Sequence, residues 1–294
     1  MFNYSTKRIE YLFNGDDTVI KKFLKKYFFK QNPYVQSYYR TPNIKFKRTS
    51  AEQAEWDKCK NDIVYFAESY FWINNISTLT VELIKLHPYQ RKILKTYTEG
   101  KTIICNSRQM GITTMNEIYA LWSLLFNTQY VQVVTDPINA HYDFMDMIRN
   151  NYVKMPYHMQ KGVTRFNKHE VICDDYSRIT DSRFKMSDRI DAVKYFLMIV
   201  DNAAYLHKAD LVDIERKLKF NIKTIITSTP NGYNDFYRLW LDSINNNTFK
   251  LNPMKLLWYE NPNYTDQWAD QMLINMGQKS FDEEIGLKFI NKSN

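Results

Sequence analysis

The sequence predicts an α/β fold, in which helices flank a parallel sheet and a helical, basic segment comes first. Short β-branched runs alternate with helical stretches from about residue 101 onward, as in strand–helix–strand units. The chain has only 7 Gly and 8 Pro, and 16% of its residues are aromatic, which indicates an ordered, packed protein. Its 294 residues can form one large domain, with or without a small subdomain.

Each element is predicted from its hydrophobic pattern. The expected strands are residues 102–106, 130–135, 183–187, the apolar run within 195–206, and 224–230. The expected helices between and after them are residues 115–126, 138–151, 207–219 and 231–244. Because each strand is followed by a helix, neighbouring strands should run parallel, with helices on both faces of the sheet.

The first hundred residues are predicted to be mainly helical. Residues 18–30 place apolar side chains on one stripe and lysines opposite, which is typical of an amphipathic helix. A second helix is expected over residues 51–73, with a cap at Thr49-Ser50. We therefore divide the chain into a basic, aromatic-rich arm (1–50) and a body (51–294). The body would consist of a helical lead-in (51–100) and a core (101–294).

Positive charge is concentrated in the arm. Residues 1–50 contain eleven Lys and Arg against three acidic residues, an excess equal to the net charge of +8 of the whole chain. Lysines interleaved with Tyr and Phe could neutralise phosphates and stack on bases. The candidate DNA contacts are Lys21, Lys22, Lys25, Lys26 and Lys30. The alternatives are a helix packed on the body with solvated lysines, and a helix lying on a membrane surface.

Other site classes find little support. The cysteines Cys59, Cys105 and Cys173 lack zinc-ligand spacing, so we expect reduced structural thiols. No segment approaches the roughly 18 apolar residues of a membrane span, and the N-terminus lacks a signal-peptide core. A cytoplasmic protein without a membrane partner is therefore expected. Asp174-Asp175 is a better turn than a metal site, and the five histidines are dispersed.

One strand–turn–helix segment has the context of a phosphate-binding loop. There, backbone N–H groups at a helix N-terminus can bind phosphates. Gly111 and Thr113 fit the pattern G-x-x-x-x-G-K-[ST], whereas Asn106 replaces the first glycine and Ile112 replaces the lysine. Taken alone, this match is weak.

A second segment could complete such a site. The apolar run of residues 196–200 ends in Asp201, which could hold Mg²⁺ through water. A second carboxylate would then polarise the attacking water, but the next residue is Asn202. The alternative is a buried strand that ends in a capping aspartate.

Beyond these segments, the chain resembles the N-terminal ATPase domain of the large terminase subunits of T-even-type tailed bacteriophages. The matching stretches follow the family's order over about residues 40–290. They resemble, in turn, the helix before the motor core, the adenine motif, the variant phosphate loop, the coupling motif and a motif near the domain's end: residues 56–68, 88–91, 107–111, 227–232 and 281–284. The resemblance implies a P-loop NTPase-like sheet. The family's variant loop also lacks the first glycine, so Asn106 is no departure from it.

The resemblance also implies a role for each matching residue. The nucleotide would be held by Tyr89, Gln90, Ser107, Arg108, Gln109, Gly111, Ile112, Thr113 and Thr114, with Gln90 reading the adenine. Magnesium would be held by Thr113 and Asp201. Arg108 would contact the γ-phosphate, and Asn202 stands at the catalytic position. Coupling of hydrolysis to movement would fall to Thr227, Ser228 and Thr229.

The departures from the family concern charge. The phosphate-loop lysine falls on Ile112, the catalytic glutamate on Asn202, and an Arg-Gly pair on Lys194-Tyr195, so both Walker motifs are degenerate. The family's nuclease domain would begin where this chain ends. Losing one such electrostatic or acid–base contribution typically costs about 10²–10⁴ in rate. We therefore expect weak or absent Mg-ATP binding and hydrolysis, unless Lys101 or Lys194 replaces the lysine.

Three functions are compatible with this pattern. The first is a catalytically degenerate, pseudo-ATPase packaging protein, for which the resemblance implies double-stranded DNA, a portal or capsid component, or true terminase subunits as partners. It would act in the host cytoplasm, or on the virion or procapsid. The second is an active or slow ATPase of a DNA-packaging motor. The third is a scaffold or inhibitor of a true terminase. The sequence leaves open whether the chain is an enzyme.

Overall fold

The computed structural model describes residues 39–75, 80–127, 130–135, 138–181, 196–220 and 222–291. Three predictions lie outside the described residues: the helix over 18–30, the strand over 183–187, and the role of Lys194. The candidate DNA contacts Lys21, Lys22, Lys25, Lys26 and Lys30 also lie outside them.

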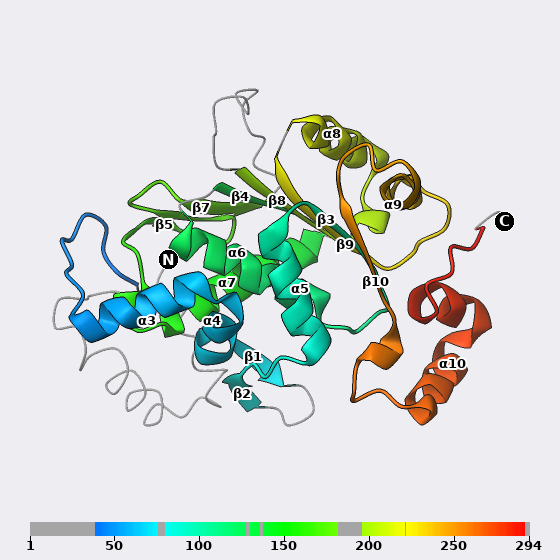
Figure 1. Cartoon of the computed structure of the whole chain (residues 1–294), viewed down its shortest axis with the longest axis horizontal. Coiled ribbons are helices and arrows are strands. Elements are labelled where there is room, and N and C mark those ends of the chain that lie inside the picture. The colour runs from blue at the N-terminus through cyan, green and yellow to red at the C-terminus, as the bar shows by residue number, and fades with distance from the viewer. Residues whose placement is uncertain are drawn as a thin grey trace.

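An eight-stranded sheet forms the centre of the described part of the chain, with strand order β10-β3-β9-β8-β4-β7-β6-β5 (Figure 1). The strands are β3 (Thr102–Asn106), β4 (Tyr130–Thr135), β5 (Val163–Phe166), β6 (Glu170–Cys173), β7 (Arg178–Asp181), β8 (Phe196–Asp201), β9 (Lys223–Ser228) and β10 (Asn252–Leu256). All pairs from β10 to β7 are parallel, which confirms the predicted α/β architecture.

The other end of the sheet is antiparallel and was not predicted. Strands β5 and β6 continue the sheet from β7 in antiparallel register. These strands are four residues long, and β5 contains the exposed Thr164 and Arg165, so they lack the apolar runs of the central strands. Short, half-polar strands joined by tight turns carry a weak sequence signal.

Helices pack on both faces of the sheet, as predicted. Helices α5 (Pro88–Glu99), α6 (Ile112–Phe126) and α7 (Ile138–Lys154) contribute to one apolar cluster with Val131 and Val133. Helices α8 (Lys208–Lys219) and α9 (Asp235–Asn245) pack with Val134 and Val200 on the opposite face. The alternation along β4 follows from the two-residue period of a strand. We call the two sides the α6 face and the α9 face.

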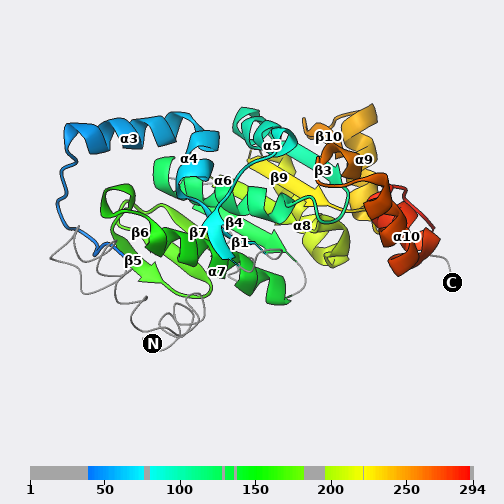
Figure 2. The ribbon, with the colours of Figure 1, turned by 90° about the horizontal axis from the view of Figure 1, so that it is seen from below.

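The predicted helix over residues 51–73 is instead two helices and a strand. Helix α3 (Ser50–Asn61) starts at the expected cap, where Thr49 and Glu52 form a capping box. Asp62 ends α3 and caps α4 (Ile63–Tyr70), because its carboxylate accepts from two backbone N–H groups of the next turn. The chain then enters β1 (Trp72–Asn75), which pairs with β2 (Thr80–Leu83). Figure 2 shows α3, α4 and α5 together on one side of the molecule.

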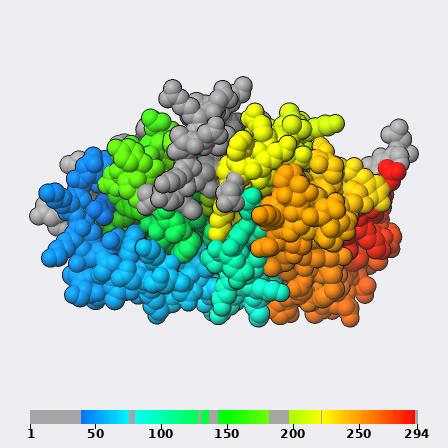
Figure 3. Space-filling model, turned by 45° about the horizontal axis from the view of Figure 1, so that its top comes forward, coloured from blue at the N-terminus to red at the C-terminus, as the bar shows by residue number. Residues whose placement is uncertain are grey.

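The two ends of the described chain lie at opposite ends of the molecule (Figure 3). Residues 39–49 lie beside β5, where the Val163 N–H donates to the Arg40 carbonyl over 2.9 Å. At the other end, α10 (Asp266–Ser280) runs into a π-helical turn, η6 (Phe281–Ile285). Within the described ranges, three short 3₁₀ turns complete the elements: η2 (Tyr157–Met159), η4 (Ala203–Tyr205) and η5 (Trp258–Glu260).

The three cysteines and Asp175 are part of the packed structure. Cys59, Cys105 and Cys173 are buried and unpaired, and burial raises the pKa of each thiol to about 12. The turn after β6 carries Asp175, which pairs with Lys161 at 2.6 Å. Among the described helices, none is long and apolar enough to cross a membrane.

Candidate functional site

The predicted phosphate loop connects β3 to α6 at the carboxyl edge of the sheet. Gln109 and Gly111 adopt left-handed φ values of 66° and 71°, and Gly111 is the N-cap of α6. A Cβ atom at Gly111 would lie 2.9 Å from Gln90 Nε2. Glycine is therefore required here both by backbone conformation and by close packing. The helix begins at Ile112 rather than at the predicted residue 115, so Thr113 and Thr114 lie in its first turn.

Neighbouring segments hold this loop in place. The Ser107 N–H donates to the Leu256 carbonyl (2.9 Å) and the Ser107 hydroxyl to the Ile285 carbonyl (2.6 Å). On the other side, the Tyr264 hydroxyl donates to the Gln109 carbonyl over 2.8 Å. These bonds are made by β10, η6 and the segment before α10, so the loop conformation depends on residues far away in the sequence.

Arg108, the predicted γ-phosphate ligand, is engaged with η6. Its guanidinium pairs with the Glu284 carboxylate at 2.6 Å, and its backbone N–H donates to the Glu284 carbonyl at 2.9 Å. The Arg108 side chain is 58% exposed, so the ion pair contributes little stability. A phosphate group could therefore compete with Glu284 for Arg108 at small energetic cost.

The residues of the predicted adenine motif lie against the same loop. Tyr89 and Gln90 are in the first turn of α5, and both are buried. The Tyr89 hydroxyl donates to the Met110 carbonyl over 3.0 Å. The Gln90 oxygen accepts from the His87 N–H (3.0 Å), and its nitrogen lies 3.5 Å from the Met110 carbonyl. Gln90 therefore supports the loop in this conformation, and reading a base would require its amide to exchange partners.

Asp201 is the centre of a hydrogen-bond network at the carboxyl end of β8. Its carboxylate accepts from the hydroxyls of Thr113 (2.7 Å) and Thr227 (2.8 Å) and from the Asn116 amide (2.9 Å). Burial raises the pKa of Asp201 above its usual value, and these bonds act in the opposite direction. Asp201 and Thr113 are adjacent hard oxygen donors, which fits the Mg²⁺ site implied by the resemblance.

Asn202, the residue expected at the catalytic position, has a conformational role. It adopts φ 56° and ψ 42° and is the N-cap of η4. The left-handed region is costly for most L-residues by about 1–2 kcal/mol, and asparagine tolerates it best after glycine. The position thus favours asparagine for its backbone and disfavours the family's glutamate.

Lys101 does not supply the cation that the resemblance implies at the phosphate loop. Ile112 is 5% exposed and packs in the apolar cluster of the α6 face. Lys101 precedes β3 at the amino end, opposite the loop, and its ammonium donates to the Leu218 carbonyl. The suggestion that Lys101 substitutes for the lysine was therefore wrong, because a whole strand separates it from the phosphate loop.

The predicted coupling residues contact the Asp201 segment directly. Strand β9 lies between β3 and β8, so Thr227 reaches Asp201 from its end. The Ser228 hydroxyl accepts from the Ala204 N–H, and the Thr229 hydroxyl lies 3.1 Å from the Tyr205 hydroxyl. A shift at Asp201 would thus be felt at residues 203–205 and at the loop after β9.

Sequence reasoning missed three polar residues of this edge, Asn116, Glu117 and Thr135. Glu117 is 5% exposed, and burial, followed by the charges of Asp201 and Asp143, raises its pKa well above the usual value. The available signal was the Asn-Glu pair at residues 116–117, inside a helix that is otherwise almost wholly apolar. A polar pair in a buried helix indicates a partner or a site.

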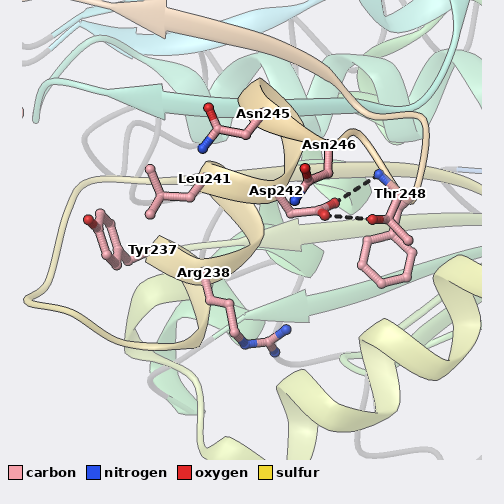
Figure 4. A pocket seen from close by; sticks show the side chains of 8 residues that line it. Tyr237, Arg238, Leu241, Asp242, Asn245, Asn246 and Thr248 are labelled. Carbon is pink, nitrogen blue, oxygen red and sulfur yellow. Dashed lines mark hydrogen bonds between the residues drawn. The ribbon is translucent and has the colours of Figure 1, made fainter.

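A separate pocket of about 500 Å³ lies on α9 and the loop that follows it (Figure 4). Its lining includes Tyr237, Arg238, Leu241 and Phe249. The Asp242 carboxylate accepts two bonds from Thr248 and holds the loop against the helix. Because α9 covers the opposite face of the sheet, this pocket is not part of the predicted nucleotide site.

No family model matches the chain. The large terminase ATPase domain of Thermus phage P74-26 is similar, with a TM-score of 0.50 and 18% identity over 70% of this chain and 94% of that domain. A large terminase from another thermophilic bacteriophage, solved in complex with ADP, has a TM-score of 0.52 and 15% identity over 70% of this chain. The bacteriophage HK97 large terminase has a TM-score of 0.58 and 13% identity over 78% of this chain.

The chain covers 54% of the ADP-bound terminase and 54% of the HK97 protein, about half of each. The similar structures come from thermophilic phages and from HK97, so they support the terminase part of the resemblance and do not single out the T-even type. At these identities the likeness concerns the fold. The described chain has the α/β fold of the ATPase domain of large terminases.

Proposed function

We propose that this chain is a DNA-packaging protein of the large-terminase kind whose nucleotide site binds Mg-ATP weakly and hydrolyses it slowly or not at all. The observation that carries the proposal is the β3–loop–α6 turn, with Thr113 of α6 bonded to Asp201 at 2.7 Å. The similar terminase solved with ADP has also been solved with ATP-γ-S, and we extend nucleotide binding from that protein to this chain.

The charges at the site argue for weak catalysis. Phosphoryl transfer depends on stabilising the charge of the phosphate oxygens. With isoleucine at position 112, the first turn of α6 offers backbone N–H groups and hydroxyls but no cation. Asn202 can bind a water molecule but cannot act as a base. Arg108 is the remaining cation at the loop in the described part of the chain, and binding would require it to leave Glu284.

Nucleotide binding is tested by thermal unfolding in the presence of Mg-ATP. A ligand at ten times its dissociation constant stabilises the folded state by about 1.4 kcal/mol, so millimolar ATP should raise Tm. The matched variant Thr113→Val removes the hydroxyl at nearly constant volume and should reduce the shift that depends on Mg²⁺. No shift for the wild-type chain at millimolar ATP would refute nucleotide binding and favour the scaffold or inhibitor function.

The partners follow from the same proposal. We propose that the chain acts in the host cytoplasm, or on the virion or procapsid, with double-stranded DNA and a portal, capsid or true terminase protein. DNA binding is assigned to the basic arm and is tested by its salt dependence. Replacing Lys21, Lys22, Lys25, Lys26 and Lys30 by Gln should lower the salt slope by about 0.9 for each phosphate that is no longer neutralised. Lys58→Gln together with Lys60→Gln, on α3, is the matched control, and an equal effect there would contradict the assignment to the arm.

A further inference from the structure

A second group of polar side chains lies beside Asp201 on the α6 face, at the carboxyl ends of β4 and β8. Thr135 ends β4 and is the register partner of Asp201. Paired residues of parallel strands point to the same face of a sheet. The Thr135 hydroxyl therefore lies on the side of the sheet where Thr113 and Asn116 of α6 reach the Asp201 carboxylate.

The Thr135 hydroxyl is buried without a partner. Thr135 is 3% exposed, and its Oγ1 makes no hydrogen bond within the described residues. A buried polar group left unsatisfied costs about 1–3 kcal/mol. Such groups are uncommon in folded proteins, so this hydroxyl points to a ligand that supplies the missing contact.

Glu117 lies on the side of α6 that is turned toward the carboxyl end of β8. Thr113 and Asn116 both contact Asp201, so their stripe of the helix is turned toward the end of β8. Glu117 lies four residues after Thr113 and therefore on the same side of the helix, one turn further in. Its side chain is almost completely buried, and no hydrogen bond or ion pair of its carboxylate is found in the described part of the chain.

The electrostatic surroundings of this group are negative. The charged residues that act on Glu117 are Asp201 and Asp143, both acidic. Across the described ranges, no Lys, Arg or His forms an ion pair with Glu117 or Asp201. Burying carboxylates without a cation is strongly unfavourable. The phosphate-loop lysine could have supplied the charge, but position 112 is an isoleucine in the apolar core.

We propose that Glu117, Asp201 and Thr135 bind a divalent cation, Mg²⁺ or Mn²⁺, in the absence of nucleotide. Carboxylates and hydroxyls are hard oxygen donors, which suit these ions better than Zn²⁺ or Cu²⁺. The described residues contain no cluster of three or more His, Cys, Asp or Glu, so hydroxyls and water complete the coordination. The inference rests on the proposed function, because the nucleotide phosphates would arrive at the same edge of the sheet. It adds a carboxylate from α6 to the expected pair of Thr113 and Asp201.

The test is a Mn²⁺ titration of the full chain without nucleotide, with free Mn²⁺ followed by electron paramagnetic resonance. The wild-type chain should bind one Mn²⁺ saturably, and Mg²⁺ should compete. Glu117→Gln should weaken binding by about tenfold or more, and Thr135→Val should weaken it to a smaller extent. Asp210→Asn is the matched control, since Asp210 is an exposed acid in the first turn of α8, which packs on the opposite face of the sheet, and it should leave Mn²⁺ affinity unchanged.

Folding controls make the result decisive. In EDTA, the Tm of Glu117→Gln and Thr135→Val should equal or exceed that of the wild type, because the first removes a buried ionisable carboxyl and the second removes an unpaired buried hydroxyl. Unchanged Mn²⁺ affinity in Glu117→Gln, or no saturable binding by the wild type, would overturn the inference. Mn²⁺ binding without any ATP binding would support this site and refute the proposed nucleotide function. ATP binding by the wild type, together with unchanged Mn²⁺ affinity in Glu117→Gln, would support the nucleotide function and refute this cation site.

Discussion

The phosphate loop and the end of β8 meet at one edge of the sheet but differ in what holds them. The loop is supported through backbone atoms, as the Ser107, Gln109 and Met110 contacts all involve main-chain carbonyls or N–H groups. The end of β8 depends on side chains, because Asp201 is bonded by two threonine hydroxyls and one asparagine amide. Contacts to main-chain atoms of the loop persist when a loop side chain is substituted. The bonds of Asp201 depend on side chains, so a single substitution removes one of them.

Under the proposed function, this difference explains how the loop keeps its shape without the charges that the terminase resemblance implies. Ile112 and Asn202 both fit their local structure: the first fills the core, and the second accepts a left-handed backbone. Neither substitution disturbs the hydrogen bonds described above. We therefore expect that the shape of the loop and its catalytic activity can be changed separately, and the following variants test this expectation.

The largest effect is expected from restoring the two family residues. Ile112→Lys with Asn202→Glu should raise ATP hydrolysis by about 100-fold or more, since each group typically contributes about 10²–10⁴. The gain should come with a loss of stability. Removing Ile112 from the core costs about 1.5–3 kcal/mol, and a left-handed glutamate adds about 1 kcal/mol. Phosphate release and Tm are the measurements. Hydrolysis that stays flat in the double variant would mean that the loop lacks more than charge.

The second effect tests the backbone conformation of the phosphate loop. Gly111→Ala should lower stability by about 1–2 kcal/mol, because of its φ of 71° and the contact with Gln90, and should abolish the Tm shift with ATP. Gly100→Ala is the matched control. Gly100 has φ −175°, an extended conformation open to any residue, and lies at the other end of β3. Equal losses in the two variants would show that the loop glycine has no special role.

A third, smaller effect concerns the pH dependence of stability and the buried Glu117 side chain near Asp201. Because the pKa of Glu117 is raised, the folded state holds its proton more tightly than the unfolded state. Without metal, the contribution of Glu117 to stability should therefore be fully present at low pH and be lost as pH rises from the usual carboxyl range through the raised pKa. Glu117→Gln has no such proton, so its Tm should exceed that of the wild type at neutral pH and converge with it in acid. Parallel Tm–pH curves for the two proteins would contradict the burial of this charge.

The smallest effect is expected at Arg108. Glu284→Gln removes the ion pair at the loop, and stability should change by less than about 1 kcal/mol because the pair is exposed. ATP affinity should increase, because Arg108 no longer has to leave a carboxylate. Asp282→Asn, which breaks the neighbouring pair with Lys288, is the control and should leave ATP affinity unaltered. A weaker ATP interaction in Glu284→Gln would mean that Glu284 positions Arg108 for the phosphate.

Several elements could be predicted because their causes are local. The central strands at residues 102–106 and 130–135 are buried apolar runs, and Thr49 with Glu52 carries the full capping-box signal. The break of the first long helix at Asp62 was missed, because an aspartate inside a helical pattern ends it only when its side chain caps the following turn. The antiparallel strands β5 and β6 were missed because they are short and half-exposed.

Local patterns were sufficient for the alternation of the central strands with helices and for a tight strand–helix turn at Gly111. These depend on residues close together in the chain: the period of apolar side chains and glycine's freedom at positive φ. Other features required the folded chain. The exclusion of Lys101, the pairing of Arg108 with Glu284, and the meeting of Glu117, Thr135 and Asp201 all join distant segments. Sheet register and helix packing set those distances, and neither is encoded in the spacing of residues along the chain.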